Sequence, residues 1–225
     1  MEKVCILLPA LNEEKTIVKV LRDLPVEELK RKYDVEVVVG DSGSVNGTVK
    51  LAMQEGAKVI SGGKGKGRNV RNCLSCIDSD YVAMLDSDGT YPATYLPSML
   101  QELQRGYDVI YGSRLKGDIV RGAMSSLNKV GNYLLTAVAR SLYKVETTDL
   151  CSGLWVFKTQ ALKRMELTAN DFELEANIYC EVVRLGLRMT YIPIIYRSRS
   201  GTKPQLRALQ DGWTILKWLI QQRVK

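Results

Sequence analysis

Two aspartates in the segment "MLDSDGTYP", Asp86 and Asp88, are the side chains whose type and spacing could most clearly do chemistry. They follow an apolar run where a buried strand would end, and Gly89 and Pro92 favour a turn that points both carboxylates the same way. Two such acids repel each other unless a cation lies between them. Carboxylates with open coordination positions suit Mg²⁺ or Mn²⁺, completed by water and phosphate oxygens. The other interpretation is an Asx-turn that ends the strand and binds no metal.

A glycine-rich segment, "GGKGKG" at 62–67, precedes a predicted helix. Its backbone N–H groups and Lys66 would attract phosphate, although the spacing is neither that of a P-loop nor that of a dinucleotide fold. Asp41 ends another apolar run. It could accept hydrogen bonds from a ribose or a base, or cap the following helix.

The elements that must position these residues alternate between short β-branched runs and helical patterns, which is typical of an α/β fold with a mainly parallel sheet flanked by helices. The expected strands are 3–9, 35–41, 57–61, 81–86, 108–113 and 188–199, and residues 153–165 are expected to form a strand followed by a short helix. The expected longer helices are 13–23, 47–56, 67–77, 92–106, 125–143 and 172–186. Ligands of open α/β sheets collect at the carboxyl ends of strands, so we expect the loops after the first four strands to form one site.

The composition describes one globular domain of 225 residues with a net charge of +7, which favours an anionic partner. Basic surfaces that bind nucleic acid interleave exposed aromatics, and that pattern is missing here. No run reaches the roughly 18 apolar residues of a membrane span, and the start resembles a strand more than a signal peptide. Five cysteines without a second CxxC or any histidine indicate reduced thiols rather than a zinc site. We therefore expect a cytoplasmic protein without a transmembrane segment.

Residues 204–225 predict a C-terminal amphipathic helix. Its apolar stripe consists of Leu206, Leu209, Trp213, Leu216 and Ile220. The stripe could pack on the core, form a homodimer interface, or lie in a membrane interface. The sequence favours packing on protein and lying in a membrane interface equally. The membrane interpretation rests on Trp218 and on the basic residues Arg207, Lys217, Arg223 and Lys225 of the same helix.

Taken in order, these segments resemble inverting glycosyltransferases of family 2 with the GT-A fold, and most closely the dolichyl-phosphate sugar synthases. The resemblance rests first on "LLPALNEEKTI", "GDSGSVNGT", "GKGRNVR" and "DSDGTYP", which is similar to the family's metal-binding D-x-D. Further along, "YGSRLKG", "TDLCSGLWVFKTQAL", "FELEANI" and "YRSRSGTK" resemble elements of the branch that uses polyprenyl phosphate. Nearly the whole chain is covered.

The resemblance implies a donor half at 1–114 and an acceptor half at 115–203. The implied nucleotide-sugar residues are Pro9, Leu11, Asn12, Glu13, Asp41, Lys66, Arg71, Ser87 and Asp88. Asp86 and Asp88 would hold Mg²⁺ or Mn²⁺ on the diphosphate and steady the charge of the leaving group. The implied catalytic set is Asp86, Asp88, Arg114 and Arg199.

The implied acceptor is dolichyl or polyprenyl phosphate at the cytoplasmic face of a membrane, with the protein bound peripherally. A phosphate monoester has a second pKa of about 6, so it needs no strong base. It needs cations to guide it past the donor's negative charge. The residues expected to supply them are Arg114, Arg197, Arg199 and Lys203.

Two departures from the family pattern bear on the donor. Ser42 stands where a second aspartate is common, and Thr90 stands where mannose synthases often have a metal-binding glutamine. Both favour a UDP-sugar over GDP-mannose, and the transferred sugar stays open between a hexose and an N-acetylhexosamine. The alternatives are a glycosyltransferase that acts on a sugar hydroxyl, or a non-catalytic module that binds nucleotide sugars. A nucleotidyltransferase fits less well, because "PALNEEKT" is not its G-x-G-T-R-like loop.

Overall fold

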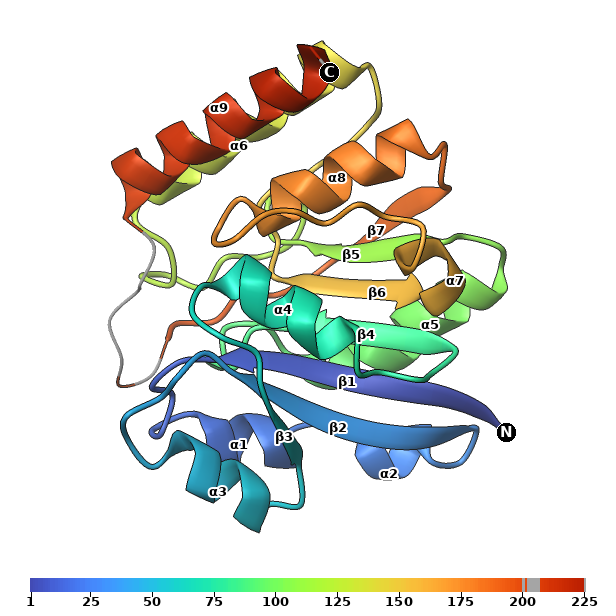
Figure 1. The fold of residues 1–225 in the computed structure, drawn as a ribbon. Coiled ribbons are helices and arrows are strands. Elements are labelled where there is room, and N and C mark those ends of the chain that lie inside the picture. The colour runs from blue at the N-terminus through green and yellow to red at the C-terminus, as the bar shows by residue number, and fades with distance from the viewer. Residues whose placement is uncertain (200, 202–206, 225) are drawn as a thin grey trace.

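The computed structural model describes residues 1–199, 201 and 207–224, and it builds them around one mixed sheet with helices on both faces (Figure 1). The strand order is β3-β2-β1-β4-β6-β5-β7. The strands are β1 (Glu2–Ala10), β2 (Tyr33–Asp41), β3 (Lys58–Ser61), β4 (Tyr81–Leu85), β5 (Val109–Ser113), β6 (Leu154–Lys158) and β7 (Met189–Pro193). The predicted α/β fold is thus confirmed.

One strand runs against the others. β1 pairs in parallel with β2 and β4, β2 with β3, and β5 with β7, whereas β6 is antiparallel to both β4 and β5. The reversal pairs Leu154 at the start of β6 with Leu85 at the end of β4. The turn that precedes β6 therefore lies beside Asp86, at the carboxyl edge of the parallel strands.

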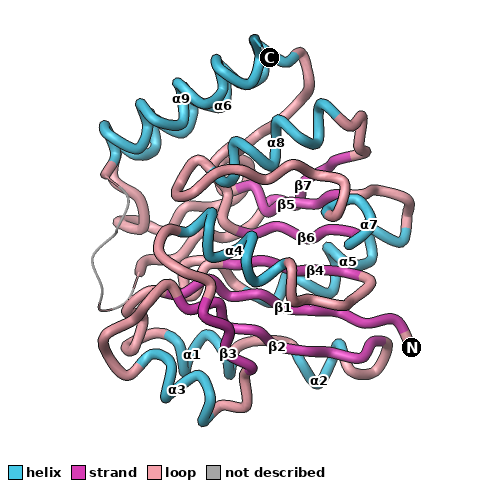
Figure 2. The backbone as a smooth tube through the Cα atoms, viewed as in Figure 1, coloured by secondary structure: helices cyan, strands magenta, loops and turns pink. Residues whose placement is uncertain are grey.

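The central strand β1 is buried on both faces, as expected for a parallel strand between two helical layers. Val4, Ile6 and Leu8 face one core cluster, while Cys5 and Leu7 face the other. The first face is covered by α1 (Ile17–Arg22), α2 (Val26–Leu29), α3 (Thr48–Gln54), the 3₁₀ turn η1 (Ala93–Tyr95) and α5 (Leu96–Gln104). The second face is covered by α4 (Lys66–Leu74), α7 (Thr159–Leu162) and α8 (Leu174–Arg184), as Figure 2 shows for the two helical layers.

Two long helices, α6 (Ser126–Tyr143) and α9 (Ala208–Val224), form an outer layer that packs on α8 (Figure 1). Their C-terminal ends are tied together, because the Tyr143 hydroxyl donates to the carbonyl of Leu219 at 2.8 Å and Arg223 Nε donates to the carbonyl of Leu142 at 3.0 Å. The helices therefore run in the same direction.

The face that α9 buries is not the predicted stripe. Ile215 and Leu219 lie in the core with Trp218 packed against them, whereas Leu209 and Trp213 are 78% and 58% exposed. The spacing alone could not choose between these neighbouring apolar rows, because together they cover a wide arc of the helix. Leu206, Lys203 and Lys225 of the sequence prediction lie outside the described residues.

Two global expectations can be compared with the structure. Within residues 1–199, 201 and 207–224, no helix has both the length and the apolar character needed to cross a bilayer. The five cysteines are free thiols, with Cys5, Cys73 and Cys180 buried in the core and Cys76 exposed. The thiols are therefore used mainly as small core residues, as the sequence predicts.

Candidate active site

A pocket of about 730 Å³ opens at the carboxyl edge of the sheet. It is lined by the segments that follow β1, β2, β3, β4, β5 and β7 and by residues of α6, α8 and α9. Pro9, Leu11, Glu13, Lys66, Asp86, Ser87, Asp88, Arg114 and Arg199 of the predicted site all line it. The convergence of the strand ends on one site is therefore a correct prediction.

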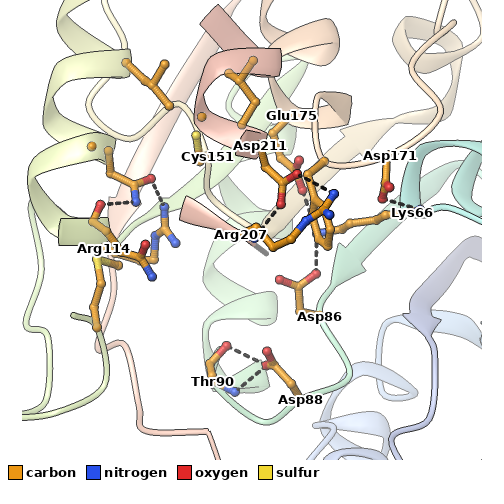
Figure 3. Close-up of a pocket in the computed structure, with 18 of the residues that line it drawn as sticks. Lys66, Asp86, Asp88, Thr90, Arg114, Cys151, Asp171, Glu175, Arg207 and Asp211 are labelled. Carbon is orange, nitrogen blue, oxygen red and sulfur yellow. Dashed lines mark hydrogen bonds and ion pairs between the residues drawn. The ribbon is translucent and has the colours of Figure 1, made fainter. Parts of the chain in front are cut away.

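Each of the two predicted metal ligands is bound to a basic side chain of this chain. Asp86 Oδ1 lies 2.6 Å from Lys66 Nζ, and Asp88 Oδ2 lies 2.8 Å from Arg199 Nη2. The other oxygen of Asp88, Oδ1, accepts from the backbone N–H of Thr90 at 3.0 Å and from its hydroxyl at 2.6 Å (Figure 3). The Asx-turn that the sequence offered as an alternative to a metal site is thus present around Asp88, and it orients one carboxylate oxygen while the other is paired with Arg199.

Lys66 also contacts a third acid. Its ammonium group lies 2.7 Å from Glu175 Oε1, so it bridges the end of β4 and the start of α8. Burial alone would lower the pKa of Lys66, but Asp86 and Glu175 raise it well above its usual value. Burial raises the pKa of Glu175, a rise that the charge of Lys66 opposes. Lys66 is therefore a cation at neutral pH.

Glu13 joins the loop after β1 to the Asp86–Asp88 loop. The hydroxyl of Thr16 lies 3.0 Å from both Glu13 Oε2 and the Ser87 carbonyl, and the Ser87 hydroxyl donates to the Pro9 carbonyl at 2.8 Å. Glu13 Oε1 in turn lies 3.1 Å from Arg199 Nη2. Because Glu13 is buried and paired in this way, it fixes the position of Arg199 beside Asp88.

Arg114 lies at the other side of the pocket in a buried ion pair. Its Nε and Nη2 donate to the two oxygens of Asp149, each at 2.7 Å, and Nη2 also donates to Asn132 Oδ1 at 2.9 Å. The guanidinium lies 5.9 Å and 5.3 Å from the ring centroids of Tyr91 and Tyr196. Burial would lower the pKa of Arg114, but Asp149 raises it well above its usual value. The bidentate pair holds the guanidinium rigidly at the pocket wall.

Some predicted donor residues organise loops instead of lining the pocket. Asn12 Oδ1 accepts from Val45 N, and Asp41 accepts from the backbone N–H groups of Gly43 and Ser44. Arg71 donates to the Leu167 carbonyl and to Asn170, which lie outside the pocket. The role of these three in donor binding stays a prediction.

The remaining predicted residues lie near the Asp88 loop or beyond the described residues. Arg197 has an exposed side chain, and its backbone N–H donates to the Thr90 carbonyl at 2.9 Å. Lys203 lies outside the described residues. Of the four predicted acceptor cations, the structure therefore brings Arg114 and Arg199 to the pocket wall.

Sequence reasoning missed several pocket residues. Glu173 and Glu175 lie two apart on a predicted helix and so do not share a face, which predicts from the sequence that one of them faces the site and the other is structural. In the structure Glu175 contacts Lys66, while Glu173 Oε1 accepts from the backbone N–H groups of Asn170 and Asp171. Sequence reasoning gave no role to Tyr91, although the "DSDGTYP" motif contains it. The signal that could have found Glu175 is its place in "FELEANI", in the first turn of a predicted helix.

Gly153, in the turn before β6, packs directly against Asp86. A Cβ atom at this position would meet the Asp86 carboxylate and the ring of Tyr91. The Gly153 backbone N–H donates to the Tyr91 hydroxyl at 2.6 Å. The antiparallel strand β6 thus brings a glycine where only hydrogen fits beside the acid.

The donor set fits a divalent ion. The ammonium group of Lys66 occupies a position between two carboxylates, which is evidence that this corner accepts positive charge. Within the described part of the chain, no three His, Cys, Asp or Glu side chains lie close enough together to hold a metal ion. An ion held by Asp86 and Asp88 would therefore need water or phosphate oxygens to complete its shell, as Mg²⁺ commonly does.

The far wall of the pocket is apolar. It is formed by the first turns of α6 and α9, with Leu127, Val130, Leu134, Leu209, Trp213 and Leu216 among its residues. Most of these side chains are strongly exposed; Leu134, for example, is 63% exposed. We call these six residues the apolar wall.

Known proteins resemble this chain both in sequence and in fold. The family model "Glycosyl transferase family 2" matches residues 5–165. Glycosyltransferase AglJ of Haloferax volcanii is 36% identical over 95% of this chain and 70% of its own. A dolichyl-phosphate hexose transferase of the same organism is 31% identical over 100% of this chain and 97% of its own.

Among solved structures, glucosyl-3-phosphoglycerate synthase from Mycobacterium tuberculosis, in complex with Mn²⁺ and UDP-glucose, superimposes with a TM-score of 0.80. It is 22% identical and covers 99% of this chain and 79% of its own, so the likeness concerns the fold. A family model that spans most of the chain, relatives aligned along its length, and a pocket with the D-x-D acids at the strand ends agree. The chain is a glycosyltransferase and belongs to glycosyl transferase family 2.

Proposed function

We propose that the protein transfers a hexose or an N-acetylhexosamine from a nucleotide sugar to dolichyl or another polyprenyl phosphate, with inversion at the anomeric carbon. The donor is a UDP-sugar in preference to GDP-mannose, and the metal is Mg²⁺ or Mn²⁺. One observation carries the proposal: a single pocket joins the cluster of acids and cations to the apolar wall. The first end suits a sugar diphosphate, and the second suits an isoprenoid chain.

The comparisons support this choice. The relative that aligns along 97% of its own length is named a dolichyl-phosphate hexose transferase, which supports the acceptor. The solved mycobacterial synthase holds UDP-glucose and Mn²⁺ on the same fold, which supports the donor and the metal. We assign residues 1–114 mainly to the donor and 115–203 mainly to the acceptor, with Glu175 reaching back to the donor end through Lys66.

In the proposed reaction, an acceptor phosphate oxygen attacks the anomeric carbon of the sugar. The new carbon–oxygen bond forms as the bond from that carbon to the donor's diphosphate breaks, and the electron pair leaves with the nucleoside diphosphate. A divalent ion held by Asp86 and Asp88 would stabilise the charge on that leaving group as a Lewis acid. No side chain has to remove a proton, because a phosphate monoester is largely dianionic at neutral pH.

The cations of the pocket have separate tasks in this proposal. Lys66 lies at the diphosphate end, beside Asp86. Arg114, held rigidly by Asp149 between two tyrosine rings, would orient the acceptor phosphate through the part of its guanidinium that lines the pocket. Arg199, between Asp88 and Glu13, lies at the same pocket and would help bring two anionic substrates together.

We place the reaction at the cytoplasmic face of a membrane, with the protein attached peripherally. The acceptor phosphate stays at the bilayer surface, so the pocket must open toward lipid. The exposed apolar side chains of α6 and α9 adjoin the pocket, and Lys129, Lys217 and Arg223 of the same helices can meet anionic headgroups. Free cysteines fit a reducing compartment.

The test is a transfer assay with the purified protein. UDP-glucose, UDP-N-acetylglucosamine and GDP-mannose are each incubated with a polyprenyl phosphate and Mn²⁺, and the glycolipid is identified by mass spectrometry. We expect one UDP-sugar to give a lipid-linked monophosphate sugar. Asp88→Asn should reduce the rate at least about 100-fold, because it removes a charge that would hold the metal ion at the leaving group.

Three results would contradict the proposal. Transfer to a free sugar hydroxyl, but to none of the polyprenyl phosphates, would favour the hydroxyl-acceptor alternative. Full activity in the presence of excess EDTA would mean that the reaction needs no metal ion. Donor binding without transfer to any acceptor would favour the non-catalytic module.

A further inference from the structure

Lys66 is held between two acids that come from different parts of the chain. Its Nζ lies 2.6 Å from Asp86 Oδ1, at the end of β4, and 2.7 Å from Glu175 Oε1, in the first turn of α8 (Figure 3). The Lys66 side chain is only 14% exposed. It begins α4, directly after Gly65, whose φ of +91° turns the chain into the pocket.

One cation is shared by two acidic side chains in this buried corner. Removing the ammonium group would leave two acids with no cation between them, which is costly in a buried site. Asp86 thus has a cation bound to it before any metal arrives.

Asp86 Oδ1 is bound to Lys66, so a metal ion at this carboxylate would lie next to the ammonium group. The two cations repel each other at that distance, which favours movement of the ammonium group away from Asp86 when the metal binds. A nucleotide diphosphate offers Lys66 another anionic partner in the same pocket. The metal ion and Lys66 therefore both bind Asp86, and the nucleotide offers Lys66 a different partner.

We propose that Lys66 couples metal binding to nucleotide binding: it holds Asp86 in the empty site and moves to the diphosphate when the nucleotide enters, which releases Asp86 for the metal ion. The inference rests on the proposed donor function and deepens it. Glu175 is the fixed point of the movement, because it is buried and keeps the ammonium group in the pocket.

Such coupling is reciprocal, so it can be measured from either side. Isothermal titration calorimetry gives the affinity for Mn²⁺ alone, for UDP alone, and for UDP in the presence of saturating Mn²⁺. For the unmodified protein we expect UDP and Mn²⁺ each to strengthen binding of the other by about 5- to 150-fold, the usual range of such couplings.

Lys66→Met tests the side chain directly, because it keeps the length of the apolar stem and removes the charge. We expect this variant to bind Mn²⁺ alone more tightly than the unmodified protein, and UDP alone more weakly. The coupling between the two ligands should fall by at least about 5-fold. Arg68→Met is the matched control, because it removes one positive charge from an exposed position of the same helix turn and should leave the coupling unchanged.

Circular dichroism checks that each variant is folded, and Lys66→Gln replaces the methionine variant if that one is not. Coupling in a folded Lys66 variant equal to that of the unmodified protein would overturn the inference while leaving UDP and Mn²⁺ binding, and hence the proposed donor, intact. If the unmodified protein bound neither UDP nor GDP with Mn²⁺ present, the proposed function and the inference would both be wrong.

Discussion

Thr90 is the residue that decides how Asp88 is presented to the pocket. Its backbone N–H and its hydroxyl both donate to Asp88 Oδ1, which leaves Oδ2 to face the pocket beside Arg199. The sequence resemblance noted above sets Thr90 against the position where mannose synthases often have a metal-binding glutamine. Here the shorter side chain would act on the metal through Asp88, as outer-shell partners of metal ligands commonly do.

Replacing Thr90 by valine should therefore weaken Mn²⁺ binding in the presence of UDP by about 10- to 100-fold, the usual effect of losing such a partner. The valine keeps the shape of the buried side chain and removes only the hydroxyl. Calorimetric titration measures the affinity, and Thr90→Ser, which restores the hydroxyl, should recover most of it. Equal affinities for the valine and the threonine proteins would mean that the hydroxyl does not orient Asp88.

The residue scale is also where the sequence predicted the site best. The order of polar segments after successive strands placed Glu13, Lys66, Asp86 and Asp88 in one pocket. It could not predict which acid would pair with which cation, because those pairs join residues up to 186 positions apart, as in Arg199 with Glu13. Such contacts depend on how loops fold over the sheet edge, and spacing along the chain carries no information about that.

At the scale of elements, α9 has two apolar rows with different environments. Leu219 is fully buried among α6, α8 and α9, whereas Ile220, the next residue, is 48% exposed. The sequence predicted the helix but chose the exposed row as its apolar stripe. The packing of α9 on α6 and α8 decides which row is core, and that contact is not encoded in the periodicity of α9 alone.

This difference gives a direct stability test. Leu219→Ala should lower the free energy of unfolding by about 2–5 kcal/mol, because it leaves a cavity in the packed outer layer. Ile220→Ala, the matched control on the adjacent position, should change it by less than about 0.5 kcal/mol, as surface substitutions do. Urea unfolding followed by circular dichroism measures both. Equal losses in the two variants would place Ile220 in the core as well.

At the scale of the whole molecule, the elements of the sheet were predictable and the direction of one strand was not. Alternating strands and helices with short loops predicted the α/β layers correctly. β6 lies between β4 and β5 and is antiparallel to both. An apolar run such as "LWVF" has the same pattern in both directions, so only the assembled sheet fixes its direction.

The exposed apolar side chains also define an orientation for the molecule. Many of them lie on α6 and α9, including Leu127, Val130, Leu134, Leu209 and Trp213 beside the pocket. If this side contacts lipid, the double variant Leu209→Ser, Trp213→Ser should lose most of its binding to vesicles of phosphatidylcholine and phosphatidylglycerol in a flotation assay.

The control for the flotation assay is Met53→Ser. Met53 is 57% exposed on α3, which covers the sheet at a distance from the outer layer of α6 and α9 (Figure 1). Its vesicle binding should match that of the unmodified protein. If the double variant floated equally well, lipid would have to contact another side of the molecule.

Gly153 restricts which substitutions this chain can accept during evolution. Any larger residue there would clash with the Asp86 carboxylate and the Tyr91 ring. The sequence of the turn before β6 therefore cannot change at this position without affecting Asp86. A side chain at 153 would displace Asp86 or Tyr91 from its position at the pocket. Substitutions at this position are thus constrained by the neighbouring Asp86 and Tyr91 side chains, although glycine itself carries no reactive group.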